Sequence, residues 1–463
     1  MIVGNNSKQE DGRLSVGRRI CYGFVDAGGG FSFTMVSSYL TVFYTDVVGL
    51  TPAVISIIML VARIWDGIND PMMGMIAEKT RTRWGKYRPY LLFGAPILGL
   101  LTVLTFTCPG WTGPAQIFYS AMTYILCGMC YTATGVAGTA LANVLTRNNQ
   151  ERMVLISFRG VISQIANLIT SAATMPLILF FGNGDASSAR GYFSAVVIYA
   201  ILGTICYWIT FAGTKEVIVP EVDAPKVPML DSLKLAFSDS NIRKLLIGYL
   251  LYMCGIFFRI GVMVYFFLYV VEKPMWLATA GVVMTAAMAV PNFIAPFLAK
   301  KFEKKKLMMA CLALGAVGGG VLFLGGNMMS LPLILIGTAV FHGCGGAVGT
   351  FSYGLIAEIV DDMEVRTGKR ADAVVLSVTS FSVKVGNALA GTVGVLLLGA
   401  VGYVANAVQS PETKMAMNAV INLVPALLLL LATIPYFFIT MSREKAARNQ
   451  EILTAKHAGK EAE

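Results

Sequence analysis

Long apolar runs separated by short polar stretches make up most of this chain. A bilayer core about 30 Å thick needs roughly 20 apolar residues per helix, and the runs reach this length again and again. The expected spans are 19–42, 53–77, 89–107, 116–144, 153–182, 192–213, 244–271, 276–299, 307–328, 331–360, 373–404 and 416–441. The pattern predicts an all-α membrane protein of about twelve transmembrane helices.

The longest polar interruption, residues 214–240, divides these spans into six and six. Basic loops recur at matching places in the two halves: 77–89 and 299–306 follow the second and eighth spans. We therefore predict two six-helix bundles, typical of alternating-access transporters, although channels and membrane enzymes also have short basic inner loops. The predicted domains are a first bundle 1–213, a cytoplasmic linker 214–243, a second bundle 244–441 and a cytoplasmic tail 442–463.

Composition and charge narrow the class further. Of the 463 residues, 56% are hydrophobic and 13% are charged, against roughly 25% charged in soluble domains, which excludes an ordinary soluble enzyme. The net charge of +10 comes from Lys and Arg in the N-terminal tail, the even-to-odd loops and the C-terminal tail. The positive-inside rule then places both termini in the cytoplasm, and the charge does not indicate nucleic acid.

Two glycine-rich stretches, 28–30 and 343–349, do not match a nucleotide-binding fingerprint. No strand precedes either stretch, and the chain contains no Walker sequence. We expect no catalytic residues and no cofactor. An ion gradient is therefore the expected source of energy for transport.

The second span carries charges that a bilayer normally excludes. Asp66 and Asp70 are four residues apart and share a helix face, with Asn69 beside them and Arg63 one turn earlier. Two close carboxylates in a low dielectric cannot both ionise freely, so one takes up a proton, binds a cation or pairs with a base. This predicts a cation-coupling site, with a static ion pair between Arg63 and Asp66 as the alternative.

Five further polar groups lie within spans, where charged side chains mark functional candidates. Lys384 lies deep among small residues and needs a carboxylate partner, for which the pair on the second span is the available choice. Asp26, Arg159 and Arg259 are the other charged candidates. Arg259 and His342 remain open between packing and a role in transport.

Several long motifs follow one another in the order of a known family. They are YGFVDAGGGF from residue 22, YTDVVGLTP from 44, ARIWDGINDPMMG from 62, TRWGKYRPYLL from 82 and AEIVDDMEVRTGKRAD from 357. With these motifs the chain resembles the glycoside–pentoside–hexuronide:cation symporters of the major facilitator superfamily. The resemblance covers nearly the whole chain and implies that superfamily's fold.

The resemblance also implies roles for particular residues. The cation-binding residues are Asp66, Asp70, Asn69 and Thr132, with Na⁺ possible at the two carboxylates. The residues lining the sugar path are Asp26, Tyr131, Arg159 and Lys384, together with Asp66 and Asp70. A charged cytoplasmic gate that latches the two bundles comprises Glu358, Asp361, Glu364 and Arg370; a merely solvated loop is the alternative for any one of these four.

Three positions depart from the family pattern. The best-known member has a sugar-binding aspartate on its first helix where this chain has Gly30. It has an aspartate and a tryptophan on its fourth helix where this chain has Gly135 and Thr139. Asp26 lies one turn from Gly30 on the same face and would supply the missing carboxylate. With fewer oxygen ligands for sodium, H⁺ is favoured over Na⁺ as the coupling ion.

These observations predict a monomeric symporter of the cell membrane. It would carry a sugar, either a glycoside, a pentoside or a hexuronide, together with a monovalent cation across the lipid bilayer. The alternatives are a sodium-coupled lysolipid transporter of the same superfamily and a sensor that binds solute without moving it. Uptake with and without a cation gradient separates the three.

Overall fold

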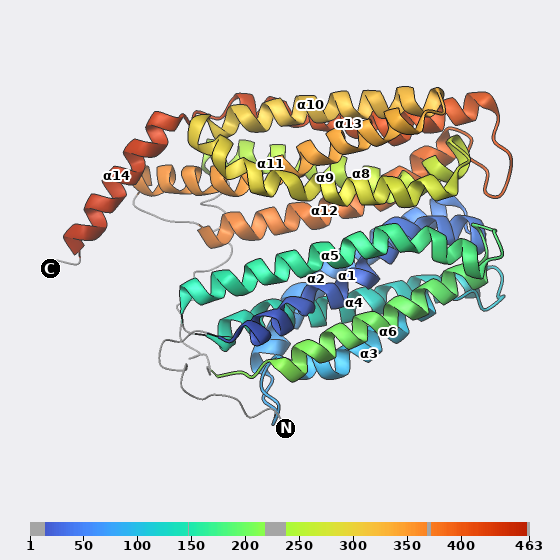
Figure 1. Cartoon of the computed structure of the whole chain (residues 1–463), viewed down its shortest axis with the longest axis horizontal. Helices are drawn as coiled ribbons and strands as arrows, with labels where there is room; N and C mark the ends of the chain where they lie inside the picture. The colour runs from blue at the N-terminus through green and yellow to red at the C-terminus, as the bar shows by residue number, and fades with distance from the viewer. Residues whose placement is uncertain (1–13, 147, 218–237, 368–371, 461–463) are drawn as a thin grey trace. The chain divides into compact units, whose positions relative to one another are not determined.

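Long helices follow one another through the described part of the chain (Figure 1). The computed structural model describes residues 14–146, 148–217, 238–367 and 372–460. The first half contains α1 (Val16–Val42), η2 (Phe43–Val47), α2 (Pro52–Lys79), α3 (Arg88–Thr105), α4 (Pro114–Leu145), α5 (Asn149–Phe181) and α6 (Ala189–Gly213). The second contains α8 (Ser240–Tyr265), η3 (Phe266–Val270), α9 (Pro274–Lys301), α10 (Lys304–Asn327), α11 (Leu331–Thr367), α12 (Asp372–Ala400), α13 (Pro411–Phe437) and α14 (Arg443–Lys460).

The helices form two compact units that repeat one packing scheme. The first unit is Met1–Asp223 with Ala405–Ala407, and the second is Ala224–Val404 with Val408–Glu463. In the first unit α1 packs on α5 and α6, α3 packs on α4 and α6, and α2 packs on α4. In the second, α8 packs on α12 and α13, α10 packs on α11 and α13, and α9 packs on α11. The division falls within the predicted linker, of which residues 218–237 lie outside the described part.

The first helix of each unit ends in the same irregular way. A π-helical segment, η2 or η3, continues the α-helix for five residues. In η2 the amide of Val48 donates to the carbonyl of Phe43 at 3.0 Å, and in η3 the amide of Val271 donates to the carbonyl of Phe266 at 2.9 Å. A proline then starts the next helix, at Pro52 and at Pro274. The two units thus share this π-helical segment and the proline after it, as well as a packing scheme.

Eleven helices in the described part, α2–α6 and α8–α13, are long and apolar enough to cross a membrane. The 27-residue α1 is not among them, because Asp26 and the glycine run 28–30 lower its mean hydropathy. It still packs within the first unit and completes six long helices there. Outward faces expose large apolar side chains such as Leu100, Phe180 and Phe297, as contact with lipid requires.

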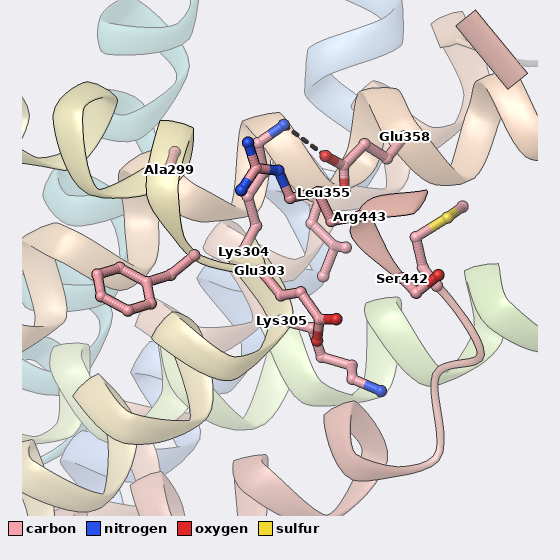
Figure 2. A pocket seen from close by; sticks show the side chains of 10 residues that line it. Ala299, Glu303, Lys304, Lys305, Leu355, Glu358, Ser442 and Arg443 are labelled. Carbon is pink, nitrogen blue, oxygen red and sulfur yellow. Dashed lines mark hydrogen bonds and ion pairs between the residues drawn. The ribbon is translucent and has the colours of Figure 1, made fainter. Parts of the chain in front are cut away.

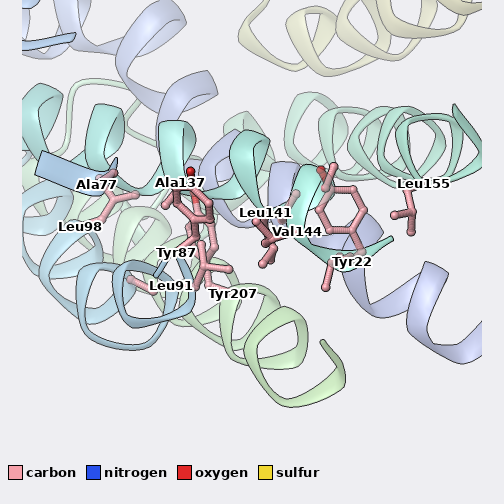
Figure 3. Close-up of a cluster of buried hydrophobic side chains, with 14 of the residues drawn as sticks. Tyr22, Ala77, Tyr87, Leu91, Leu98, Ala137, Leu141, Val144, Leu155 and Tyr207 are labelled. Carbon is pink, nitrogen blue, oxygen red and sulfur yellow. The ribbon is translucent and has the colours of Figure 1, made fainter. Parts of the chain in front are cut away.

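A cluster of buried apolar side chains holds the helices of the first unit together. Figure 3 shows part of this cluster, which includes Tyr22, Leu91, Leu98, Leu141 and Tyr207. Close approach of α1 and α6 requires a glycine: a Cβ at Gly28 would lie 2.7 Å from Cδ2 of the Tyr207 ring. This close contact between α1 and α6 sets the position of α1 in the first unit, and with it the position of Asp26.

Candidate functional site

The charged stripe of α2 meets α4. Thr51 caps the start of α2 by accepting the amide of Val54, and Pro52 occupies the first turn, so the helix begins where proline is best tolerated. Farther along, Arg63 Nη1 lies 3.1 Å from Asp66 Oδ2, and Arg63 Nη2 donates to the Tyr124 hydroxyl at 2.8 Å. The Arg63–Asp66 pair considered from the sequence is therefore present.

The second carboxylate of α2 has a different partner on α4. The Thr132 hydroxyl donates to Asp70 Oδ1 at 2.9 Å. Asn69 beside it is fully buried, and neither atom of its amide finds a hydrogen-bond partner among the described residues. The structure thus brings together the four residues predicted to bind the cation, Asp66, Asn69, Asp70 and Thr132. Their carboxylate, amide and hydroxyl oxygens suit a hard cation, and a carboxylate alone suits a proton.

A cavity of about 310 Å³ lies beside this seam within the first unit. Three of the residues predicted to bind sugar line it: Asp26 from α1, Tyr131 from α4 and Arg159 from α5. Arg159 Nε lies 2.5 Å from Asp26 Oδ2, and Arg159 Nη2 donates to the Thr139 hydroxyl at 3.1 Å. The carboxylate and the guanidinium neutralise one another, and both remain partly exposed to the cavity.

Aromatic, amide and hydroxyl groups complete the cavity wall. The rings of Phe33 and Tyr131 stack with centroids 5.8 Å apart, and Ser163 and Asn167 line the side formed by α5. Glycines give the cavity its room: a Cβ at Gly135 would meet no atom within 4 Å. The cavity is therefore open at Gly135, one of the positions expected to depart from the family pattern, and Asp26 lines the same space.

Lys384 lies on α12, in the second unit, with an exposed side chain. Its predicted pairing with the carboxylates of α2 would join the two units and stays a prediction.

At the predicted cytoplasmic gate, Glu358 on α11 pairs with Lys304 at the start of α10, at 2.7 Å. Figure 2 shows this pair among the side chains that line a small pocket beside Arg443. Asp361 is half-buried and Glu364 is buried, while Arg370 lies outside the described residues. A latch between the bundles stays a prediction.

The sequence analysis missed the acid that organises this end of the second unit. Asp362 is almost completely buried, with 1% of its side chain exposed. Its carboxylate accepts from Arg366 Nε at 2.9 Å, from Asn449 at 3.0 Å and lies 2.7 Å from Lys445 Nζ. Lys445 and Asn449 belong to α14, so Asp362 fastens the C-terminal helix to α11. Two adjacent acids, Asp361 and Asp362, are visible in the sequence. The sequence does not show which of the two faces the interior of the unit.

Arg366 extends the cluster to the start of α8. Its Nη2 atom lies 2.5 Å from Asp239 Oδ2, while Asp239 Oδ1 accepts the amides of Asn241 and Ile242. Burial would raise the pKa of Asp239, but the hydrogen bonds from Arg366 and the two amides outweigh burial and lower it. The stabilisation from Asp239 is therefore complete above its ordinary pKa, about 3.9, and is lost as the pH falls below that value.

Replacing Asp362 by asparagine is expected to destabilise the protein by roughly 2 kcal/mol, because charged hydrogen bonds to two helices are lost. Trypsin should also cleave α14 several-fold faster, since Lys445 is no longer held. Asp361→Asn is the matched control, one residue away on a less buried face, and should change both readouts less. Equal losses in the two variants, measured by thermal unfolding and timed proteolysis, would refute the role of Asp362.

Two solved structures share the fold of this chain. The chain superposes on a D-xylose–proton symporter with a TM-score of 0.62 at 14% identity, covering 93% of this chain and 98% of that one. It superposes on the nucleoside transporter NupG with a TM-score of 0.61 at 14% identity, covering 91% and 100%. Identity this low establishes only that the chain shares the fold of these two proteins.

Sequence comparison gives the family. The model of the MFS/sugar transport protein family matches residues 21–443, so the chain belongs to that family. An isoprimeverose transporter of Lactiplantibacillus pentosus is 34% identical over 403 residues, covering 87% of this chain and 83% of the relative. A putative glycoside/cation symporter, YagG, of Escherichia coli K12 is 29% identical, covering 90% of each.

A glucuronide carrier protein homolog of Escherichia coli K12 is 28% identical and covers 92% of each chain. These relatives confirm the predicted glycoside–pentoside–hexuronide family and the prediction of a transporter rather than an enzyme. The predicted all-α membrane fold is likewise confirmed.

Proposed function

We propose that this protein is a cation-coupled symporter that brings a glycoside into the cell. The observation that carries the proposal is the position of α4 between two candidate sites. Tyr131 lines the cavity, and the next residue, Thr132, donates to Asp70 in the carboxylate cluster of α2. Binding at either site therefore acts on the same turn of α4, and such coupling is reciprocal in free energy.

The cavity supports an uncharged sugar as the substrate. Hydroxyl groups of a sugar need both donors and acceptors, which the Asp26–Arg159 pair, Ser163 and Asn167 provide. The stacked rings of Phe33 and Tyr131 suit the apolar face of a pyranose. Because Asp26 already neutralises Arg159, the first unit offers little net charge to a hexuronide. The polar lining also argues against a lysolipid, which would need an apolar cleft.

The proposal extends to the coupling ion and to the setting. Arg63 pairs with Asp66 and weakens its attraction for a metal cation, while the Thr132 hydroxyl donates to Asp70. This supports H⁺ rather than Na⁺. The distribution of Lys and Arg supports a cell-membrane protein with both termini in the cytoplasm. Both candidate sites lie in one chain, in keeping with a monomer.

The test is uptake by membrane vesicles that contain the protein, with isoprimeverose, the sugar in the relative's name, as the first labelled glycoside. An imposed proton gradient should drive accumulation, and adding sugar to de-energised vesicles should make the lightly buffered medium more alkaline. Varying Na⁺ at fixed pH should leave uptake unchanged. Strong stimulation by Na⁺ without alkalinisation would overturn the choice of ion. Binding without accumulation under either gradient would indicate a sensor and overturn the proposed function.

A further inference from the structure

The second unit encloses an arginine that neither proposed site uses. Arg259 on α8 is fully buried, and none of its three guanidinium nitrogens finds a hydrogen-bond partner among the residues that the structure describes. Its Cζ atom lies 5.4 Å from the centroid of the Phe266 ring. That cation–π contact is weaker than the desolvation penalty of a buried guanidinium, which stays protonated in proteins.

The contacts between α8 and α11 determine which residues of the two helices lie level with one another. The Tyr252 hydroxyl donates to the carbonyl of Gly345 at 2.6 Å, and a Cβ at Gly345 would lie 2.6 Å from Ile256 Cδ1. One further turn along each antiparallel helix brings Arg259 level with His342. The structure therefore sets the arginine and the histidine opposite one another at the seam of α8 and α11.

His342 and Thr338, four residues apart, lie on one face of α11. Their exposed fractions are 0% and 1%. Both ring nitrogens of His342 and the hydroxyl of Thr338 lack a hydrogen-bond partner within the described part of the chain. The His342 ring also contacts the Phe341 ring, with the two centroids 5.0 Å apart.

No acidic side chain of the second half is available at this depth. The sequence contains no Asp or Glu in 240–271, 273–302, 304–357, 373–411 or 413–443. The first half, in contrast, carries Asp26, Asp66 and Asp70 within its spans. A permanent positive charge in an enclosed interior requires a negative partner, and the second unit does not supply one from its own spans.

We propose that Arg259, His342 and Thr338 bind a small inorganic anion of the chloride type inside the second unit. The three side chains offer N–H and O–H donors, which suit an acceptor-only ligand. Because all three are enclosed, the ligand is small, and a sugar acid is too large. The anion neutralises Arg259 and holds α8 against α11. This site is separate from the cation and sugar sites of the first unit.

The test uses the purified full-length protein in detergent, without sugar and without a gradient. Thermal unfolding is followed as sodium chloride replaces sodium gluconate at constant Na⁺, pH and ionic strength. A bound anion should raise Tm by a few degrees in a saturable way. Because the assay involves neither sugar nor transport, its failure is distinct from a failure of the proposed symport.

Variants locate the effect. Arg259→Met keeps much of the side-chain volume, removes the charge and should abolish the dependence of Tm on chloride. Thr338→Val keeps the side-chain shape and should raise several-fold the chloride concentration that gives half of the maximal change in Tm. This variant still tests the site if Arg259→Met does not fold. Arg190→Met, on the exposed start of α6, is the matched control and should retain the full chloride effect.

Three results would overturn the proposal. The first is a wild-type Tm that is the same in chloride and in gluconate. The second is a chloride effect that Thr338→Val and Arg259→Met leave unchanged. The third is stabilisation by glucuronate where chloride has none, which would assign Arg259 to the acidic group of a substrate.

Discussion

Replacing Asp70 by asparagine is expected to abolish concentrative uptake and to leave the fold intact. The amide oxygen can still accept the Thr132 hydroxyl, now 2.9 Å from Asp70 Oδ1, so the contact between α2 and α4 survives. An amide cannot take up a proton near neutral pH, and it offers a metal cation no net charge. Sugar would then equilibrate across the membrane at a ratio of about one instead of accumulating, because the coupling free energy is gone.

Two assays on the same vesicles separate coupling from binding in the Asp70→Asn protein. Gradient-driven accumulation should vanish, whereas exchange of labelled for unlabelled sugar, which needs no net cation movement, should persist at a reduced rate. Asp185→Asn, an exposed acid in the loop before α6, is the matched control and should accumulate sugar normally. Full accumulation by Asp70→Asn would remove Asp70 from the coupling mechanism.

The Asp26–Arg159 pair should have the second-largest effect, on sugar affinity. Either Asp26→Asn or Arg159→Gln leaves one charge of the cavity unbalanced and removes charged hydrogen bonds to the sugar. Each such bond contributes about 1.5–3 kcal/mol, so the KM for sugar should rise roughly 10- to 100-fold. The Thr139 hydroxyl accepts a hydrogen bond from Arg159 Nη2 at 3.1 Å. Thr139→Val removes only this bond, so it should raise KM less than Asp26→Asn or Arg159→Gln does.

A double variant distinguishes a sugar site from a structural ion pair. Asp26→Asn combined with Arg159→Gln restores neutrality, so thermal stability should return toward that of the wild type. Sugar affinity should stay low, because both ligands are gone. Recovery of affinity together with stability would show that the pair only shapes the bundle. Glu151→Gln, which breaks the Arg19–Glu151 pair of the same unit at 2.6 Å, is the control outside the cavity.

Much of the fold follows from hydropathy alone. Each expected span coincides with a helix of the structure to within several residues, since an apolar run of this length has no other stable form in a bilayer. The terminal helix α14 was expected only as a tail, because its surface is polar and tertiary contacts hold it. The π-helical segments were also missed, since they add no periodicity that a hydrophobic pattern would show.

Spacing within one helix was easier to interpret than contacts between helices. Asp66 and Asp70 were paired from their separation along α2, and the structure keeps both on the face that meets α4. The Asp26–Arg159 contact joins α1 to α5, and no local pattern encodes it. The same limit explains Asp362: adjacent acids point about 100° apart on a helix, and only the packing of α14 shows which one is buried.

The duplicated scaffold has a consequence for the energetics of accumulation. Helices α2 and α9 have 28 residues each, and both begin at a proline after a π-helical turn. Counted from those prolines, Met288 and Asn292 stand where α2 has Asp66 and Asp70. Of these two helices, α2 therefore carries an ionisable pair at these positions and α9 does not, so under the proposed function the cation site lies in the first unit. A monovalent one-to-one symporter cannot exceed a tenfold gradient of neutral solute for each 59 mV or so of driving force.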